Sequence, residues 1–156
     1  MRKPSRFALP LTVLAIVFFV ILADQTTKSM MRQFFERHGT SNSWPLGTVI
    51  HQNHGIVANV PIPLYIILLL TIAALILISW MSYHAMHKGN IRALIALSLI
   101  FGGALSNALD RAVFGYVFDW ILVFQSGALN IADVMIGGGI VGYVLFGSAK
   151  PPTPNP

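Results

Sequence analysis

The sequence IPLYIILLLTIAALILISW, residues Ile62–Trp80, is a run of 19 residues that carries no charge. As a helix rising about 1.5 Å per residue it spans about 29 Å, close to the thickness of the hydrocarbon core of a bilayer. Three further apolar runs lie at residues 7–23, 93–108 and 131–147. Lipid cannot hydrogen-bond an open backbone, so we expect each run to be helical. The sequence predicts an all-α membrane protein with four transmembrane helices.

The composition agrees with this class. The chain has 156 residues, of which 55% are hydrophobic and 10% charged, and we expect one domain over residues 1–150. It has no cysteine, which excludes disulfides, thiolate metal sites and a cysteine nucleophile. The net charge of +5 comes from basic residues that lie between the apolar runs, so no nucleic-acid partner is expected.

The first apolar run follows Arg2, Lys3 and Arg6, the arrangement of a secretory signal peptide. A cleavage site requires small residues at the end of the run. Here the run ends Ile21-Leu22-Ala23, with a bulky isoleucine where a small residue is required. We therefore expect a retained span.

The charges between the runs predict an orientation. Basic residues precede the first run, follow the fourth and occupy the loop between the second and third, which places both termini and that loop in the cytoplasm. The opposite side also carries basic residues, so the bias is modest, but an even number of spans fits it. All five acidic residues then fall on the outer side: Asp24, Glu36, Asp110, Asp119 and Asp133.

The outer segment, residues 25–61, is the largest piece between the runs. It begins with helical character over Gln25–Arg37, and Thr48–His51 has strand character before a turn at Asn53–Gly55. Tyr116–Phe118 is a second strand candidate. These patterns predict a small extracytoplasmic sheet. The proline-rich tail, residues 151–156, is expected to be disordered.

Polar residues within the helical runs need partners. Asp24 and Lys28 are four residues apart and share a helix face, so they form an ion pair, or Lys28 reaches lipid phosphate or substrate while Asp24 holds nearby amides. Asn107 either holds a substrate carbonyl or joins two helices. Asp110 and Arg111 are expected to form local pairs at the outer helix ends.

Small residues lie on the same run as Asn107. Gly102, Gly103 and Ser106 are expected to let another helix approach closely.

Asp119 and Asp133 are the candidate catalytic pair. Fourteen residues of continuous helix would separate them by about 21 Å, but Gln125–Ala128 is typical of a turn that doubles the chain back. Two carboxyls that share a proton can hydrolyse a peptide with water. The alternative is that Asp133 only favours a helix N-terminus, where Asn130 is a candidate cap, and that Asp119 is solvated.

Other catalytic chemistries have little support. The pairs His51/His54 and His84/His87 are not joined by a third ligand at a metal-binding spacing, so no metal site is predicted. The H-E-x-x-H and G-x-S-x-G motifs are not in the sequence.

Five blocks in order carry a resemblance to a known family. They are Asp24-Gln25-Thr26-Thr27-Lys28, Asn53-His54-Gly55, Gly102 through Arg111, Val117-Phe118-Asp119, and Asn130-Ile131-Ala132-Asp133. Together with the four-span layout, they resemble the lipoprotein signal peptidases, the type II signal peptidases of bacteria. The resemblance covers nearly the whole chain apart from its two tails.

The resemblance implies a multi-pass aspartic endopeptidase of the bacterial cytoplasmic membrane. Its substrate is a prolipoprotein whose cysteine carries a diacylglyceryl group, and membrane phospholipid surrounds it. The implied fold has four transmembrane helices, a small extracytoplasmic β-sheet and a surface helix. The implied protein is a monomer that needs no metal or cofactor. Asp119 and Asp133 are implied to be the catalytic pair, and the site is shaped by Asp24, Lys28, Asn53, Gly55, Asn107, Asp110, Arg111, Asn130 and Ala132.

The sequence departs from the family pattern at three places. Residues 56–61 replace the usual small residues and aromatic, Ser106 replaces a glycine, and Trp120 replaces a phenylalanine. The change at residues 56–61 bears on the structure of the outer loop and on substrate preference. Two other functions stay open from the residues alone: a proton-coupled transporter or channel subunit, and a noncatalytic membrane assembly factor.

Overall fold

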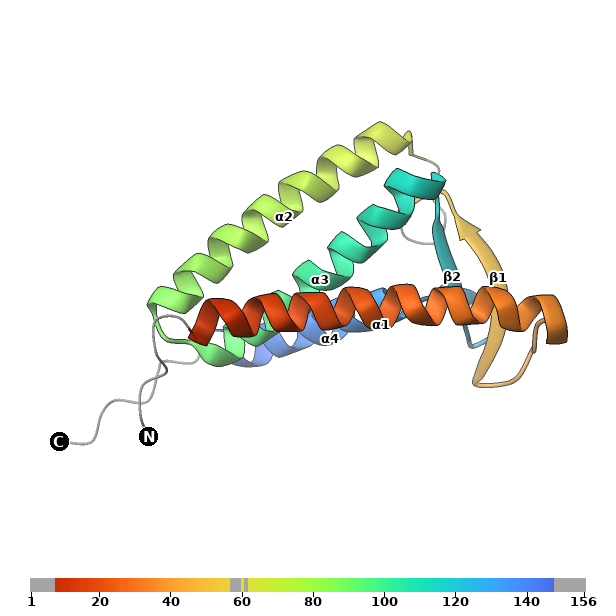
Figure 1. The fold of residues 1–156 in the computed structure, drawn as a ribbon, viewed down its shortest axis with the longest axis horizontal. Helices are drawn as coiled ribbons and strands as arrows, with labels where there is room; N and C mark the ends of the chain where they lie inside the picture. Colours follow the sequence, from red (N-terminus) through yellow and green to blue (C-terminus); the bar gives the residue numbers. More distant parts are fainter. Residues whose placement is uncertain (1–7, 57–59, 61, 148–156) are drawn as a thin grey trace.

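The structure, a computed structural model, describes residues 8–56, 60 and 62–147. The predicted disordered tail at residues 151–156 lies outside these residues. The described residues form four helices and three strands, in the order α1 (Ala8–His38), β1 (Leu46–Asn53), α2 (Leu64–His87), α3 (Ile91–Phe114), β2 (Val117–Val123), β3 (Gly127–Leu129) and α4 (Ile131–Phe146). The sheet lies at one end of the helical part, beside the C-terminal portion of α1 (Figure 1).

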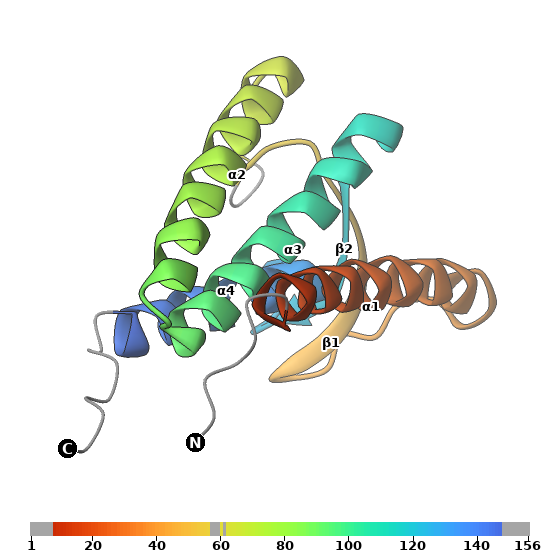
Figure 2. The same ribbon diagram turned by 60° about the vertical axis from the view of Figure 1, so that its left-hand side comes forward.

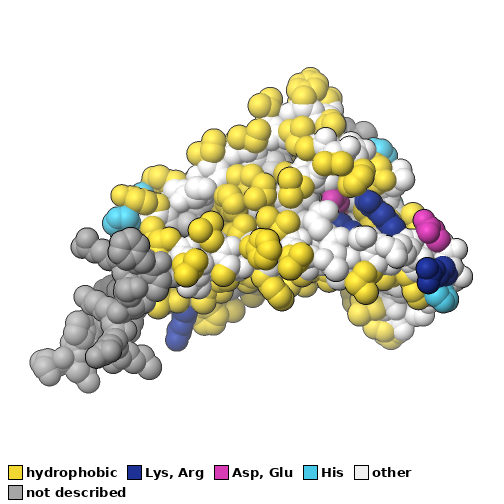
Figure 3. All heavy atoms as spheres, viewed as in Figure 1, with side chains coloured by type: hydrophobic (Ala, Val, Ile, Leu, Met, Phe, Trp, Pro, Cys, Tyr) yellow, Lys and Arg dark blue, Asp and Glu magenta, His cyan; other side chains and the backbone are white. Residues whose placement is uncertain are grey.

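Each predicted apolar run corresponds to one helix, but α1, α2 and α3 continue well past the ends of their runs. Three of them, α1, α2 and α3, are long and apolar enough to cross a membrane, whereas α4 is apolar but has only 16 residues. Their outer faces carry large apolar side chains, such as Phe18, Ile76 and Val144, which are 67%, 65% and 72% exposed. Hydrophobic side chains cover most of the helical part of the face in Figure 3. A surface of this kind is suited to lipid.

The helical character predicted for residues 25–37 is present, but these residues do not form a separate surface helix. These residues form the outer part of α1, a single helix of 31 residues. The sequence between Ala23 and Arg37 has no glycine or proline to interrupt it, and the ion pair of Asp24 with Lys28 bridges the junction. The helix ends only before Gly39, whose φ of 71° is left-handed.

Helix α3 is the centre of the bundle. It packs against each of the other three helices, and 56% of its most apolar stretch is buried, against 11% for α1 and for α2. A Cβ atom on Gly102 would lie 3.0 Å from Val20, and one on Gly103 would lie 2.6 Å from the Ala132 carbonyl oxygen. The predicted close approach of helices is confirmed, and it brings α1 against Gly102 and α4 against Gly103.

The sheet is antiparallel in the order β1-β2-β3. The predicted strand at Thr48–His51 lies within β1, and the candidate at Tyr116–Phe118 overlaps β2. The predicted turn is a tight hairpin in which Phe124 and Gln125 have φ of 49° and 57°, and β3 already starts at Gly127. Since β3 runs directly into α4, the hairpin returns the chain to the bundle. Figure 2 shows β1 and β2 beside α1 and α3.

Candidate active site

Asp119 is presented by the middle of β2. It is 1% exposed, and its two carboxylate oxygens accept from Asn130 Nδ2 at 2.6 Å and from Asn53 Nδ2 at 3.1 Å. Asn53 stands on the neighbouring strand, at the point where β1 ends. The sheet register therefore aims Asp119 away from solvent and toward the start of α4.

Asp133 occupies the first turn of α4. Asn130 caps this helix by accepting from the Asp133 N–H at 2.9 Å, and Asp133 Oδ2 accepts from the Asn130 N–H at 3.2 Å. This reciprocal capping box confirms the predicted cap and fixes the Asp133 side chain. Its other oxygen, Oδ1, accepts from Asn107 Nδ2 at 2.9 Å.

Two asparagine side chains join the two acids. Asn130 Nδ2, which donates to Asp119, also donates to Asn107 Oδ1 at 3.1 Å, and Asn107 in turn donates to Asp133. The chain of contacts Asp119–Asn130–Asn107–Asp133 brings together residues that are fourteen positions apart in the sequence. The convergence predicted from the turn is thus present in the fold.

A buried ion cluster lies behind the pair. Lys28, 2% exposed, contacts Asp24 Oδ2 at 2.6 Å, Asp110 Oδ2 at 2.9 Å and Asn107 Oδ1 at 3.2 Å, so its three donors have three acceptors. Asp24 Oδ1 accepts from the Ala132 N–H at 2.9 Å. The cluster thus connects α1 and α3 to the first turn of α4.

The outer loop closes the site from the side of β1. Asn53 Oδ1 accepts from the Gly55 N–H at 3.0 Å, and the Gly55 carbonyl accepts from Arg111 at 2.8 Å. Arg111 also has a buried Nε without a hydrogen-bond partner among the described residues. This N–H is a donor that a bound molecule can satisfy.

The electrostatics around Asp119 favour its neutral form. Burial and, less strongly, the charge of Asp133 raise the pKa of Asp119 to about 6, although hydrogen bonds from Asn53 and Asn130 and the charge of Lys28 act in the opposite direction. A carboxyl that exchanges its proton near neutral pH is suited to acid–base catalysis.

All the predicted site residues belong to one hydrogen-bond network. It contains Asp24, Lys28, Asn53, Gly55, Asn107, Asp110, Arg111, Asp119, Asn130, Ala132 and Asp133.

For Lys28, Asp110 and Asn107 the structure defines roles that the sequence left open. Lys28 forms the expected ion pair, but its ammonium is enclosed, so it does not reach lipid. Asp110 pairs with Lys28 of α1, not with its neighbour Arg111. Asn107 joins helices and also contacts Asp133.

The sequence did not predict that Gln25 and Ser106 hydrogen-bond to the buried acids of the site, or that His51 lies beside Asp119. Gln25 Nε2 donates to Ser106 Oγ at 3.1 Å and to Asp110 at 2.8 Å, and Ser106 donates to Asp24 at 2.7 Å. The signal for Gln25 and Ser106 was that a polar side chain within an apolar helix needs a hydrogen-bond partner. His51 lies opposite Asp119 in the sheet register and, like Asn53, on the same face of β1. Only the register reveals this position.

Comparison with protein families gives one match that covers most of the chain. The model for signal peptidase (SPase) II, Peptidase_A8, matches residues 16–148. A lipoprotein signal peptidase of Halothermothrix orenii is 30% identical over 146 residues, which cover 88% of this chain and 97% of that protein. The lipoprotein signal peptidase of Methylobacterium radiotolerans is 47% identical over 55 residues, and there the match spans about a third of either chain (33% and 32%).

A solved structure gives the same result for the fold. A bacterial membrane enzyme determined by the in meso method at 2.3 Å has a TM-score of 0.76 and 25% identity, with 93% of this chain and 94% of that chain covered. The family match covers the described site from Asp24 to Asp133. The chain therefore belongs to the signal peptidase II family.

Proposed function

We propose that this chain is an aspartic endopeptidase that removes the signal peptide from prolipoproteins whose cysteine carries a diacylglyceryl group. The observation that carries the proposal is the convergence of Asp119 and Asp133 on Asn107 and Asn130 at one end of an apolar bundle. Membership of the signal peptidase II family supports it.

The two carboxyls act as a general acid and a general base. The ionised carboxyl takes a proton from a water molecule, and the oxygen of that water attacks the scissile carbonyl carbon. The protonated carboxyl donates its proton to the carbonyl oxygen. The resulting tetrahedral intermediate collapses as the amide nitrogen is protonated and the C–N bond breaks. The pair begins with one shared proton and titrates as a unit.

The geometry supports binding of a lipidated substrate from within the membrane. An apolar groove of about 640 Å³ is lined by residues of α1 and α3 and by Met135 of α4, the helix that carries Asp133. Acyl chains or the apolar part of a signal peptide would move from surrounding lipid into this groove with little change in free energy. The groove would therefore mainly position the scissile bond at the carboxyls.

The membrane placement follows from the same argument. We propose that α4 is a fourth span, that the site and sheet lie at the outer face of the bacterial cytoplasmic membrane, and that both termini are cytoplasmic. Of the buried polar side chains in the described residues, all but Ser98 belong to the site network. This concentration at one end supports a peptidase at the membrane surface and not a transporter with a polar path across the bilayer.

Cleavage of a defined substrate tests the proposal. We expect the purified full chain in lipid micelles to cut a prolipoprotein peptide with a diacylglyceryl cysteine immediately before that cysteine, as read by mass spectrometry. The same peptide without the lipid is expected to be cut at least about 100-fold less efficiently, because it loses positioning by the lipid. Absence of cleavage of the lipidated peptide by folded protein would reject the proposal.

The pH profile of this cleavage should report the carboxyl pair. Since the pKa of Asp119 is raised to about 6, loss of the shared proton above that pH should lower kcat/KM by about tenfold per pH unit. Asn53→Ala removes a hydrogen bond that lowers the pKa, so the decline should begin at higher pH, although residual activity will be lower. Gln52→Ala, at an exposed position next to Asn53 on the other face of β1, is the matched control. An alkaline limb that is identical in Asn53→Ala and the control would contradict the assignment.

A further inference from the structure

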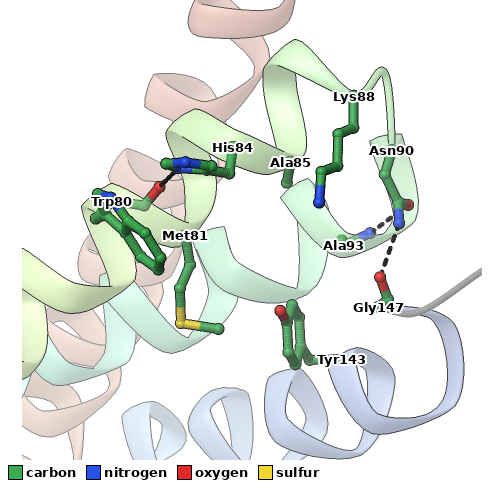
Figure 4. A pocket seen from close by; sticks show the side chains of 9 residues that line it. All are labelled: Trp80, Met81, His84, Ala85, Lys88, Asn90, Ala93, Tyr143 and Gly147. Atoms are coloured by element: carbon green, nitrogen blue, oxygen red, sulfur yellow. Dashed lines mark hydrogen bonds between the residues drawn. The ribbon is translucent and has the colours of Figure 1, made fainter.

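The bundle has a polar pocket at the end far from the carboxyl pair. It lies where α2 turns into α3, beside the end of α4, and has a volume of about 190 Å³. Its lining includes Trp80, His84, Lys88, Asn90 and Tyr143 (Figure 4). None of these residues belongs to the catalytic network, so the pocket needs a separate explanation.

The walls of the pocket are held in place by the fold. Asn90 caps α3 by accepting from the Ala93 N–H at 3.1 Å, and it donates to the Gly147 carbonyl at 3.0 Å, which ties the start of α3 to the end of α4. Ala85 and Ala93 are buried in the small core beneath, against which Tyr143 packs. The pocket is therefore built from three helices.

The pocket has positive charge that no acidic residue balances. The Lys88 ammonium points into the space between the α2–α3 turn and α4 (Figure 4), and within the described residues it has neither an ion-pair nor a hydrogen-bond partner. All five acidic residues of the chain lie in the outer part of α1, the end of α3, β2 or the first turn of α4, at the opposite end of the bundle. Arg92, in the first turn of α3, is a second cation at this end of the bundle and lies over the Phe146 ring at 5.5 Å.

Neutral donors and aromatic rings complete the lining. The Tyr143 hydroxyl points up into the pocket in Figure 4 and has no side-chain hydrogen bond within the described part of the chain. Trp80 is 59% exposed and packs on His84 in a tilted arrangement, with ring centroids 4.4 Å apart. Tryptophan at the end of a membrane helix marks the level of the lipid headgroups. The donors thus lie at the depth at which lipid phosphates occur.

We propose that this pocket binds a phosphate group, presented by an anionic phospholipid of the leaflet that faces the α2–α3 turn. Lys88 supplies the charge and Tyr143 a hydrogen bond, and the lipid's acyl chains would run along the apolar faces of α2 and α4. A phosphate is small enough for 190 Å³ and needs the donors found here. The site is independent of the peptidase reaction.

Thermal unfolding with defined lipids tests this site. The full chain in neutral detergent is titrated with phosphatidylglycerol, phosphatidylcholine or inorganic phosphate at constant ionic strength. A ligand that binds only the folded state raises the unfolding midpoint in proportion to its affinity. We expect saturable stabilisation by phosphatidylglycerol but not by phosphatidylcholine, with an affinity reduced at least about tenfold in Lys88→Gln. Tyr143→Phe should give a smaller reduction, because it removes only a neutral donor.

Arg37→Gln is the matched control, since it removes an exposed cation at the opposite end of the bundle. Equal stabilisation in wild type and Lys88→Gln, or equal loss in Lys88→Gln and Arg37→Gln, would overturn the proposal. Stabilisation by inorganic phosphate alone that is lost in Lys88→Gln would support the phosphate site and identify a free anion as its source. Lys88 is exposed and unpaired, so the variant is expected to fold.

Discussion

Asp119→Asn and Asp133→Asn are each expected to lower cleavage of a diacylglyceryl-modified prolipoprotein by at least about 1,000-fold. An amide has nearly the shape of the carboxyl but can neither take a proton from water nor donate one to the scissile carbonyl. The two single variants should be as inactive as the double variant, since the residues act as a unit. The measurement is single-turnover cleavage, followed by mass spectrometry of the released signal peptide.

The main alternative cause of inactivity is loss of structure. Asp119 accepts from two amide groups and Asp133 completes the cap of α4, so an amide at either position places one N–H against another donor. The variants should therefore also be tested for capture of the lipidated peptide by crosslinking. We expect them to hold the peptide uncut. Glu36→Gln, which neutralises an exposed carboxylate on α1, is the matched control and should retain turnover. Near-normal cleavage by either asparagine variant would refute the catalytic pair.

The features that the sequence predicted well are those governed by local pattern. The uncharged run at residues 62–80 lies mostly in α2, and the capping role of Asn130 follows from its position three residues before Asp133. The close helix packing follows from Gly103, where a Cβ atom would collide with α4. Each of these depends on neighbours along the chain, so periodicity and residue type suffice to predict them.

The features that the sequence left open depend on long-range geometry. Spacing showed that Lys28 shares a helix face with Asp24, but only the packing of α1 on α3 shows that this face is buried against Asp110. Gln25 was overlooked because its partners, Ser106 and Asp110, are more than eighty residues away along the chain. The first span and the helical segment at residues 25–37 were predicted separately, and they form one helix because position relative to the membrane does not end a helix when the sequence has no residue that interrupts it.

Burial of the ion cluster has a further consequence for the carboxyl pair. Asp24 and Asp110 bring two negative charges close to Asp119 and Asp133, and Lys28 is the buried cation that opposes all four. Its charge helps to keep one carboxylate of the pair ionised, while burial and the mutual repulsion of the pair favour a retained proton. Lys28 is therefore expected to influence both the stability of the fold and the protonation of the site.

Lys28→Met is accordingly expected to destabilise the protein by about 3–5 kcal/mol, because it leaves Asp24 and Asp110 buried without a counter-ion. Lys28→Arg should rescue little of this loss. The three acceptors converge at 2.6–3.2 Å on a single nitrogen, which suits a compact ammonium and not a planar guanidinium. Arg37→Gln, which removes an exposed cation from the same helix, should change stability by less than about 0.5 kcal/mol. Unfolding in mild detergent, followed by tryptophan fluorescence, measures these differences.

A second substitution separates loss of charge balance from loss of packing. Adding Asp110→Asn to Lys28→Met neutralises one of the two carboxylates left without a counter-ion. It restores none of the contacts made by the methylene groups of the lysine side chain. If uncompensated charge is the cause, the double variant should be more stable than Lys28→Met by at least about 1 kcal/mol, since leaving a charged group buried and unpaired costs more than leaving a neutral one. A double variant that is less stable than Lys28→Met would mean that Asp110 stabilises the fold chiefly through Gln25 and the Phe118 N–H, which also donate to it. Stability of Lys28→Met within 1 kcal/mol of wild type would contradict the buried ion cluster itself.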